Sequence, residues 1–112
     1  MKALVVLLLA CVSGAAMAAG TRCAPGQHGF AGQGDGQTVD QAIIVCGAQD
    51  ERDGVSAESA FLRVTFPGYK FLSQSLMTAN GDTYDKYVIQ LASGQKRIVF
   101  FNITEFFGKR QP

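Results

Sequence analysis

Few side chains in this 112-residue chain belong to the types that carry out catalysis. His28 is its one histidine, and a Ser-His-Asp or Cys-His enzyme would need that residue as its base. It stands in a glycine-rich stretch, which offers no rigid support for a proton-transferring group. Catalysis at His28 is therefore not expected.

Four carboxylates could supply the paired acid and base of a glycosidase-like site: Glu58, Asp82, Asp85 and Glu105. The pattern gives structural reasons for several of them. Glu58 sits at a predicted helix start, Asp82 in a predicted hairpin turn and Glu105 in a predicted helical turn. No convergent set of acid, base and nucleophile emerges, so we expect a protein without catalytic residues and without a cofactor.

Two further residue sets could bind metal ions. Cys23 and Cys46 with one distant histidine make a poor zinc set, and in an oxidising compartment they predict a disulfide instead. Such a bridge would stabilise the fold by about 3.5 kcal/mol in the chain-entropy model. The acidic residues within 47–54 lack the spacing of an EF-hand loop, so we expect no metal site.

The first eighteen residues have the pattern of an export signal. Lys2 precedes an apolar run from Ala3 to Val12, which is too short to span a bilayer, and Ala16-Met17-Ala18 has the small-residue pattern of a signal-peptidase site. We expect cleavage after Ala18 and a periplasmic or secreted protein with no membrane span. The alternative is a lipoprotein anchored at Cys11, because Leu8-Leu9-Ala10-Cys11 resembles a lipobox.

Removal of residues 1–18 would leave 94 residues with nine basic and nine acidic side chains. This length predicts one domain with a modest core. A neutral chain has no general attraction for nucleic acid or anionic lipid, so a nucleic-acid partner is not expected.

The chain then divides into two expected parts, 19–54 and 55–112. Residues 24–37 are rich in glycine but carry neither the G-x-G-x-x-G nor the P-loop pattern, so they predict a loop closed by the disulfide. Residues 38–46 are compatible with a capped short helix or a strand, and the run Ile43-Ile44-Val45 favours the strand. Residues 47–54 predict a charged loop.

The second part predicts one helix followed by three strands. Ser56 is a good N-cap for a helix over 57–66, and Pro67-Gly68 would end it. Asn80-Gly81 is a strong hairpin signal. The expected strands cover 69–78, 83–92 and 95–103, and residues 104–108 predict a helical turn that buries Phe106 or Phe107. The predicted fold class is α+β, with one helix packed across a three- to four-stranded antiparallel meander and a disulfide-closed, glycine-rich N-terminal loop.

This pattern resembles PepSY-type domains of exported bacterial proteins over about half of the chain. The matching residues are Phe66-Pro67-Gly68, Tyr87-Val88-Ile89, Ser93-Gly94, Asn102, Thr104 and Gly108. Asn102 stands where such domains often have an aspartate. The resemblance implies a module that binds and restrains a peptidase outside the cytoplasm, and it implies no active site.

The third strand is apolar on both faces, which raises the question of what covers the second face. One expectation is an exposed partner surface formed by Tyr84, Ile98 and Phe100. The other is that the disulfide loop and Thr38–Val45 cover this face. The predicted function is a small, exported, non-catalytic protein-binding module, such as an inhibitor or immunity-type protein. The alternative is a structural or accessory subunit of a bacterial envelope assembly; the sequence leaves the partner and the oligomeric state open.

Overall fold

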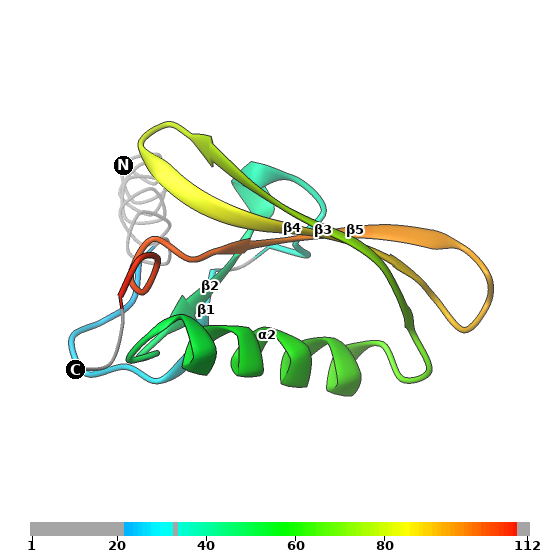
Figure 1. The fold of residues 1–112 in the computed structure, drawn as a ribbon, viewed down its shortest axis with the longest axis horizontal. Coiled ribbons are helices and arrows are strands. Elements are labelled where there is room, and N and C mark those ends of the chain that lie inside the picture. Colours follow the sequence, from blue (N-terminus) through cyan, green and yellow to red (C-terminus); the bar gives the residue numbers. More distant parts are fainter. Residues whose placement is uncertain (1–21, 33, 110–112) are drawn as a thin grey trace, which may run out of the picture.

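The computed structural model describes residues 22–32 and 34–109, which form a mixed five-stranded sheet with one long helix across one of its faces (Figure 1). The expected signal peptide, with Cys11 and Ala18, lies outside these residues. The elements in chain order are β1 (Gly29–Ala31), the 3-10 helix η1 (Val39–Gln41), β2 (Ile43–Cys46), α2 (Glu51–Thr65), β3 (Lys70–Ala79), β4 (Asp82–Gln90) and β5 (Lys96–Asn102).

The sheet has the order β1-β2-β5-β4-β3. The antiparallel meander of β3, β4 and β5 is confirmed, and β1 pairs antiparallel with β2. The expectation of a purely antiparallel sheet was wrong, because β2 runs parallel to β5. The cause is the crossover through α2: the helix returns the chain to the end from which β2 started, so β3 and β5 run in the direction of β2.

The helix begins six residues earlier than the sequence pattern predicted, at Glu51 instead of Ala57. Ser56 is not its N-cap. Asp50 fills that role, and its carboxylate accepts a hydrogen bond from the Asp53 backbone N–H. The expected division between residues 54 and 55 therefore falls inside α2. The helix ends at Thr65, just before Pro67-Gly68, as expected.

The local turns of the second part agree with the prediction. Asn80 and Gly81 have positive φ angles of 53° and 84°, as a tight hairpin between β3 and β4 requires. The chain after β5 makes a turn that buries Phe106, which is 1% exposed, whereas Phe107 is 45% exposed.

The segment before α2 contains more regular structure than expected. Residues 38–46 form both alternatives in succession, first η1 and then β2. The glycine-rich stretch carries the short strand β1, so it is not only a loop. Gly36 accepts a 2.6 Å hydrogen bond from the Phe100 backbone N–H, which fixes this stretch against β5.

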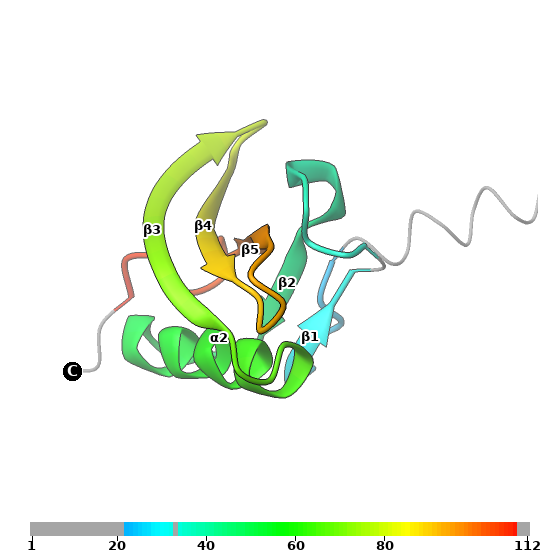
Figure 2. The same ribbon diagram turned by 90° about the vertical axis from the view of Figure 1, so that its right-hand side faces the viewer.

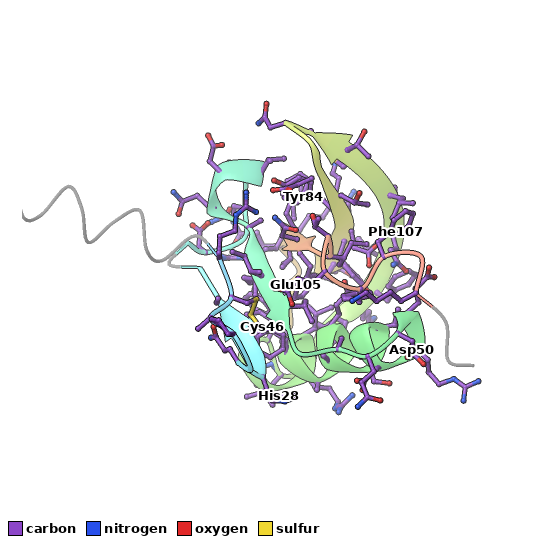
Figure 3. The ribbon with its side chains drawn as sticks, turned by 90° about the vertical axis from the view of Figure 1, so that its left-hand side faces the viewer. His28, Cys46, Asp50, Tyr84, Glu105 and Phe107 are labelled. Carbon is purple, nitrogen blue, oxygen red and sulfur yellow. A yellow bond between two sulfur atoms is a disulfide. The ribbon has the colours of Figure 1, made fainter. Side chains whose placement is uncertain are left out.

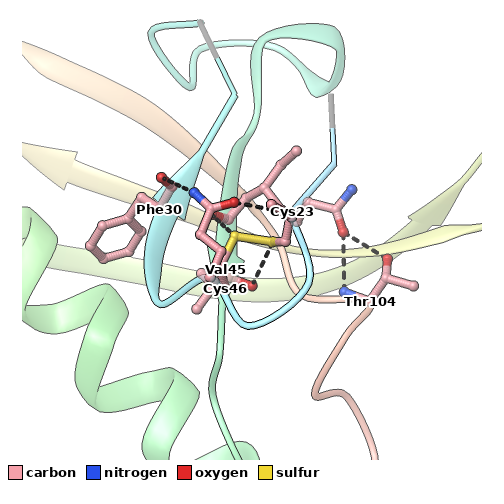
Figure 4. Close-up of a disulfide and its surroundings, with 9 residues drawn as sticks. Cys23, Phe30, Val45, Cys46 and Thr104 are labelled. Carbon is pink, nitrogen blue, oxygen red and sulfur yellow. Dashed lines mark hydrogen bonds between the residues drawn. A yellow bond between two sulfur atoms is a disulfide. The ribbon is translucent and has the colours of Figure 1, made fainter. Parts of the chain in front are cut away.

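The predicted disulfide is present: Cys23 is bonded to Cys46 at the end of β2, with the two Cα atoms 5.8 Å apart (Figure 4). The bridge ties the start of the described chain to an interior strand of the sheet. It lies beside Val45, which is buried in the core.

The core has two parts, one on each face of the sheet. The larger lies under α2 and contains Ile43, Val45, Leu62, Tyr87, Ile89, Val99, Phe101, Ile103 and Phe106. The smaller lies on the opposite face and contains Ala42, Tyr84 and Phe100, with Val39, Met77 and Ala79 packed against it. The second face of β4 and β5 is therefore covered around Tyr84 and Phe100, whereas Ile98 on the same face is 37% exposed.

Candidate functional site

The partner surface expected from the sequence is mostly inaccessible. Tyr84 and Phe100 are 5% and 9% exposed, because Val39 and Ala42 pack over them. This agrees in part with the alternative in which the disulfide loop and Thr38–Val45 cover the second face, because Val39 and Ala42 lie against these two rings. Ile98, at 37% exposure, is the one member of the expected set with substantial accessible surface.

His28 lies at the start of β1 and is exposed, beside a shallow depression lined also by Cys46 and Asp53. The sulfur of Cys46 is bound in the disulfide, and the Asp53 carboxylate accepts a hydrogen bond from the Gln49 N–H. Neither group is placed as a nucleophile or a partner for the histidine. Figure 3 shows His28 and Phe107 at well-separated places on the molecule.

Of the four carboxylates considered for chemistry, Asp82 has a structural role and Glu105 is exposed. Asp82 lies 3.4 Å from the guanidinium of Arg22 and accepts a hydrogen bond from the Asn102 amide. Glu105 is exposed in the turn after β5. Among residues 22–32 and 34–109, no group of three metal-binding side chains occurs, and no helix has the length and apolar character needed to cross a membrane.

The structure does bring the other two carboxylates together. Glu58 on α2 is completely buried, and Asp85 on β4 is 4% exposed. The hydroxyl of Tyr87 donates a 2.8 Å hydrogen bond to Glu58 Oε1. Glu58 Oε2 meets no N–H or O–H donor within the described part of the chain, and the Asp85 carboxyl is close enough to share a hydrogen bond with Glu58.

This environment keeps a proton on Glu58. Burial raises the pKa of Glu58 to about 9, and the hydrogen bond and negative charge of Asp85 act in the same direction, against the opposing hydrogen bond from Tyr87. Burial also raises the pKa of Tyr87, and the neighbouring Glu58 adds to that effect. At neutral pH Glu58 is therefore protonated.

The sequence pattern predicted a different place for Glu58, in the first turn of a helix that begins later. Because α2 starts at Glu51, Glu58 lies in its middle. The spacing of Glu58 in the sequence could have shown that it lies on a buried helix face. Gly54, Glu58 and Leu62 follow one another at four-residue intervals, and all three are buried on one face of α2.

Asp85 opens into a groove between α2 and β3, which we call the α2–β3 groove. Its volume is about 310 Å³. It is lined by Glu51 and Val55 of α2, Gln74, Ser75 and Leu76 of β3, Asp85 of β4, and Ile103, Phe106 and Phe107 of the C-terminal turn. Figure 3 shows Phe107 on the side of the molecule where β3 lies.

β3 forms the outer wall of this groove and one edge of the sheet. It pairs with β4 alone, so its other side presents free backbone groups among the described residues. Three large apolar side chains on it are exposed: Phe71, Leu72 and Leu76, at 57%, 43% and 55%. Figure 2 shows β3 curving along the margin of the sheet above α2.

Comparison with protein-family models, with curated proteins and with solved structures finds no match for this chain. The similarity to PepSY-type domains therefore stays a hypothesis based on the residues quoted above.

Proposed function

We propose that this protein is a small exported module without catalytic activity, which binds another protein through the free edge of β3. The observation that carries the proposal is a ten-residue strand whose outer edge has no partner among the described residues and which exposes three apolar side chains. Inhibition of an enzyme outside the cytoplasm, as the PepSY resemblance implies, is one form that this binding takes.

Exposed strand edges are normally protected in proteins, since they pair readily with other chains. Charged residues, prolines or short length are the usual protection. β3 is long, contains no proline and has one charged residue, Lys70, at its start. A partner strand added to this edge would gain backbone hydrogen bonds, and the exposed Phe71, Leu72 and Leu76 would supply apolar contacts.

The proposal of a non-catalytic role is supported by the inaccessibility of the one close carboxyl pair. Glu58 is completely buried and does not line the α2–β3 groove, so of this pair a substrate in the groove would meet only Asp85. A paired acid and base must both reach the bond that they act on.

Capture of a partner from envelope extract tests this function, with the disulfide-bonded protein as bait. Leu72→Lys places a charge on the edge strand outside the groove lining and is expected to reduce capture of the partner strongly. Val64→Lys is the matched control, because Val64 is 80% exposed and belongs to α2 and not to the β3 edge. Equal capture by both variants would contradict the proposed edge.

The same edge favours a second candidate function, a subunit that assembles with itself in an envelope structure. Two copies of β3 can pair antiparallel across a two-fold axis, as in isologous dimers. Light scattering of the purified protein distinguishes the two. A monomer supports the binding module, whereas a defined oligomer that Leu72→Lys dissociates would support the subunit.

Export is part of the proposal and has its own test. Mass analysis of the N-terminus is expected to find a protein that starts at Ala19. A lipidated product that starts at Cys11 would place the protein on a membrane surface instead.

A further inference from the structure

We propose that the α2–β3 groove binds a long basic side chain, arginine or lysine, from a partner strand that lies along β3. This inference rests on the proposed function and specifies the chemistry of the partner.

The charged residues that line the α2–β3 groove are all acidic. Two charged residues line it, Glu51 and Asp85, and both are acidic. The ion pair found among the described residues joins Arg22 to Asp82, so neither of the two groove carboxylates has a cation within salt-bridge distance in this part of the chain. The Glu51 carboxylate is held near the groove by a 2.8 Å hydrogen bond from the Gly108 N–H.

Asp85 is a buried carboxylate that lacks a cationic partner among the described residues. Its carboxylate is 4% exposed and opens into the groove, and the neighbour behind it is another carboxyl group, Glu58. A buried negative charge is costly unless a cation or several hydrogen-bond donors compensate it. Tyr87 donates its hydroxyl to Glu58 and not to Asp85. A cationic group in the groove would therefore meet a carboxylate with unused acceptor capacity.

The walls of the groove match the rest of a basic side chain. Val55, Leu76 and Phe107 are exposed apolar residues around it, and Ile103 and Phe106 are buried at its base. Lysine and arginine bury their aliphatic stems against such surfaces while the charged head finds a polar partner. Leu76 and Gln74 belong to β3 itself, so a strand paired with that edge would lie beside the groove.

The experiment uses two small probes on the isotope-labelled, disulfide-bonded protein at low salt. N-acetyl-arginine methylamide carries the guanidinium, and N-acetyl-citrulline methylamide has the same length with a neutral urea. We expect the arginine probe to shift amide resonances of Leu76, Asp85 and Phe107, and to bind about tenfold more tightly than the citrulline probe. Equal binding of the two probes, or none by either, would overturn the inference.

Two variants locate the charge. Asp85→Asn is expected to reduce affinity for the arginine probe about tenfold, because it removes the charge and keeps the shape of the side chain. Glu105→Gln removes an exposed carboxylate outside the groove and is expected to leave the affinity unchanged. A similar loss in both variants would show nonspecific attraction and contradict the site. The contrast between the two probes on the unaltered protein remains decisive even if Asp85→Asn fails to fold.

Failure of this inference can be distinguished from failure of the proposed function. Capture that depends on Leu72, together with equal binding of the two probes, would leave the edge as a binding surface and overturn the basic side chain. Capture that does not depend on Leu72 would overturn the proposed function, and the inference with it.

Discussion

The ring of Phe106 lies directly against the backbone of Gly54, in the first part of α2. Gly54 is a buried residue of the helix, and a Cβ atom at this position would overlap the ring carbons of Phe106. This contact joins the helix to the turn after β5. It explains why a residue that disfavours helices stands inside one.

Gly54→Ala is therefore expected to destabilise the protein by about 1–3 kcal/mol, because the methyl group would displace Phe106. Helix propensity alone predicts the opposite sign, a gain of about 1 kcal/mol. Urea denaturation measures the difference. Ser56→Ala, at an exposed position of the same helix, serves as the control and is expected to change stability little. A more stable Gly54→Ala protein would show that Phe106 does not pack there.

Stability is expected to fall as the pH rises from about 4.5 to about 9 because of Glu58. Its pKa is raised from 4.5 to about 9 in the folded protein, so across this interval the folded state holds a proton that the unfolded state releases. The stabilising contribution of Glu58 is complete at pH values below its pKa in the unfolded chain. It is lost as the pH rises toward its pKa in the folded protein, at up to ~1.4 kcal/mol per pH unit.

Glu58→Gln tests this dependence, because glutamine cannot lose a proton and has nearly the same shape. Denaturation curves at pH 5, 7 and 9 give the free energy of unfolding of the unaltered protein and of the variant at each pH. The expected result is a markedly flatter pH dependence in Glu58→Gln. Parallel pH profiles for the two proteins would refute a protonated Glu58.

Tyr87→Phe is expected to cost about 1–3 kcal/mol, since it leaves Glu58 Oε1 buried without its hydrogen-bond donor. Thermal denaturation at neutral pH measures the loss. Tyr84→Phe is a matched control: Tyr84 is also buried, on the opposite face of the sheet, and its hydroxyl makes no hydrogen bond with the described residues. Similar losses for both variants would argue against a specific role of the Tyr87 hydroxyl.

Replacement of Phe100 by serine is expected to lower the thermal midpoint substantially, because the ring is buried under Val39 and Ala42. Ile98→Ser should have a much smaller effect, since Ile98 is 37% exposed. An exposed partner surface at Tyr84, Ile98 and Phe100, one of the two expectations from the sequence, would leave the midpoint nearly unchanged in both variants. An unchanged midpoint in Phe100→Ser would show that the segment around η1 leaves this face open.

Local chemistry made part of the fold predictable. Asn80-Gly81 fixes the hairpin because both residues accept a positive φ, and Pro67-Gly68 stops the helix. The start of α2 was missed because Asp50 and Asp53 look like loop residues, although the same pair forms the N-cap contact. Gly54 also made a helix look unfavourable at this point. The contact that requires a glycine there is with Phe106, 52 positions later, and the local sequence does not reveal it.

The candidate site depended on distant contacts, so the sequence could not assemble it. Glu58 and Asp85 meet only because α2 crosses the face of β4. The burial of Tyr84 and Phe100 depends on the position of the η1 segment, which neither residue's own strand reveals. The apolar residues on both faces of β5 did not decide between an exposed partner surface and a second face covered by the N-terminal segment.

The parallel pairing of β2 with β5 has a consequence for the order of folding. β2 is complete at Cys46, but the strand that flanks it toward the centre of the sheet ends at Asn102. This pairing can form only after the chain from Gly47 to Gln95 has closed into a loop that brings β5 to β2. Such long-range pairing slows folding, because a long loop must close before the contact is gained. An early bond between Cys23 and Cys46 would meanwhile hold β1 and β2 together as a hairpin, ready for the last strand to arrive.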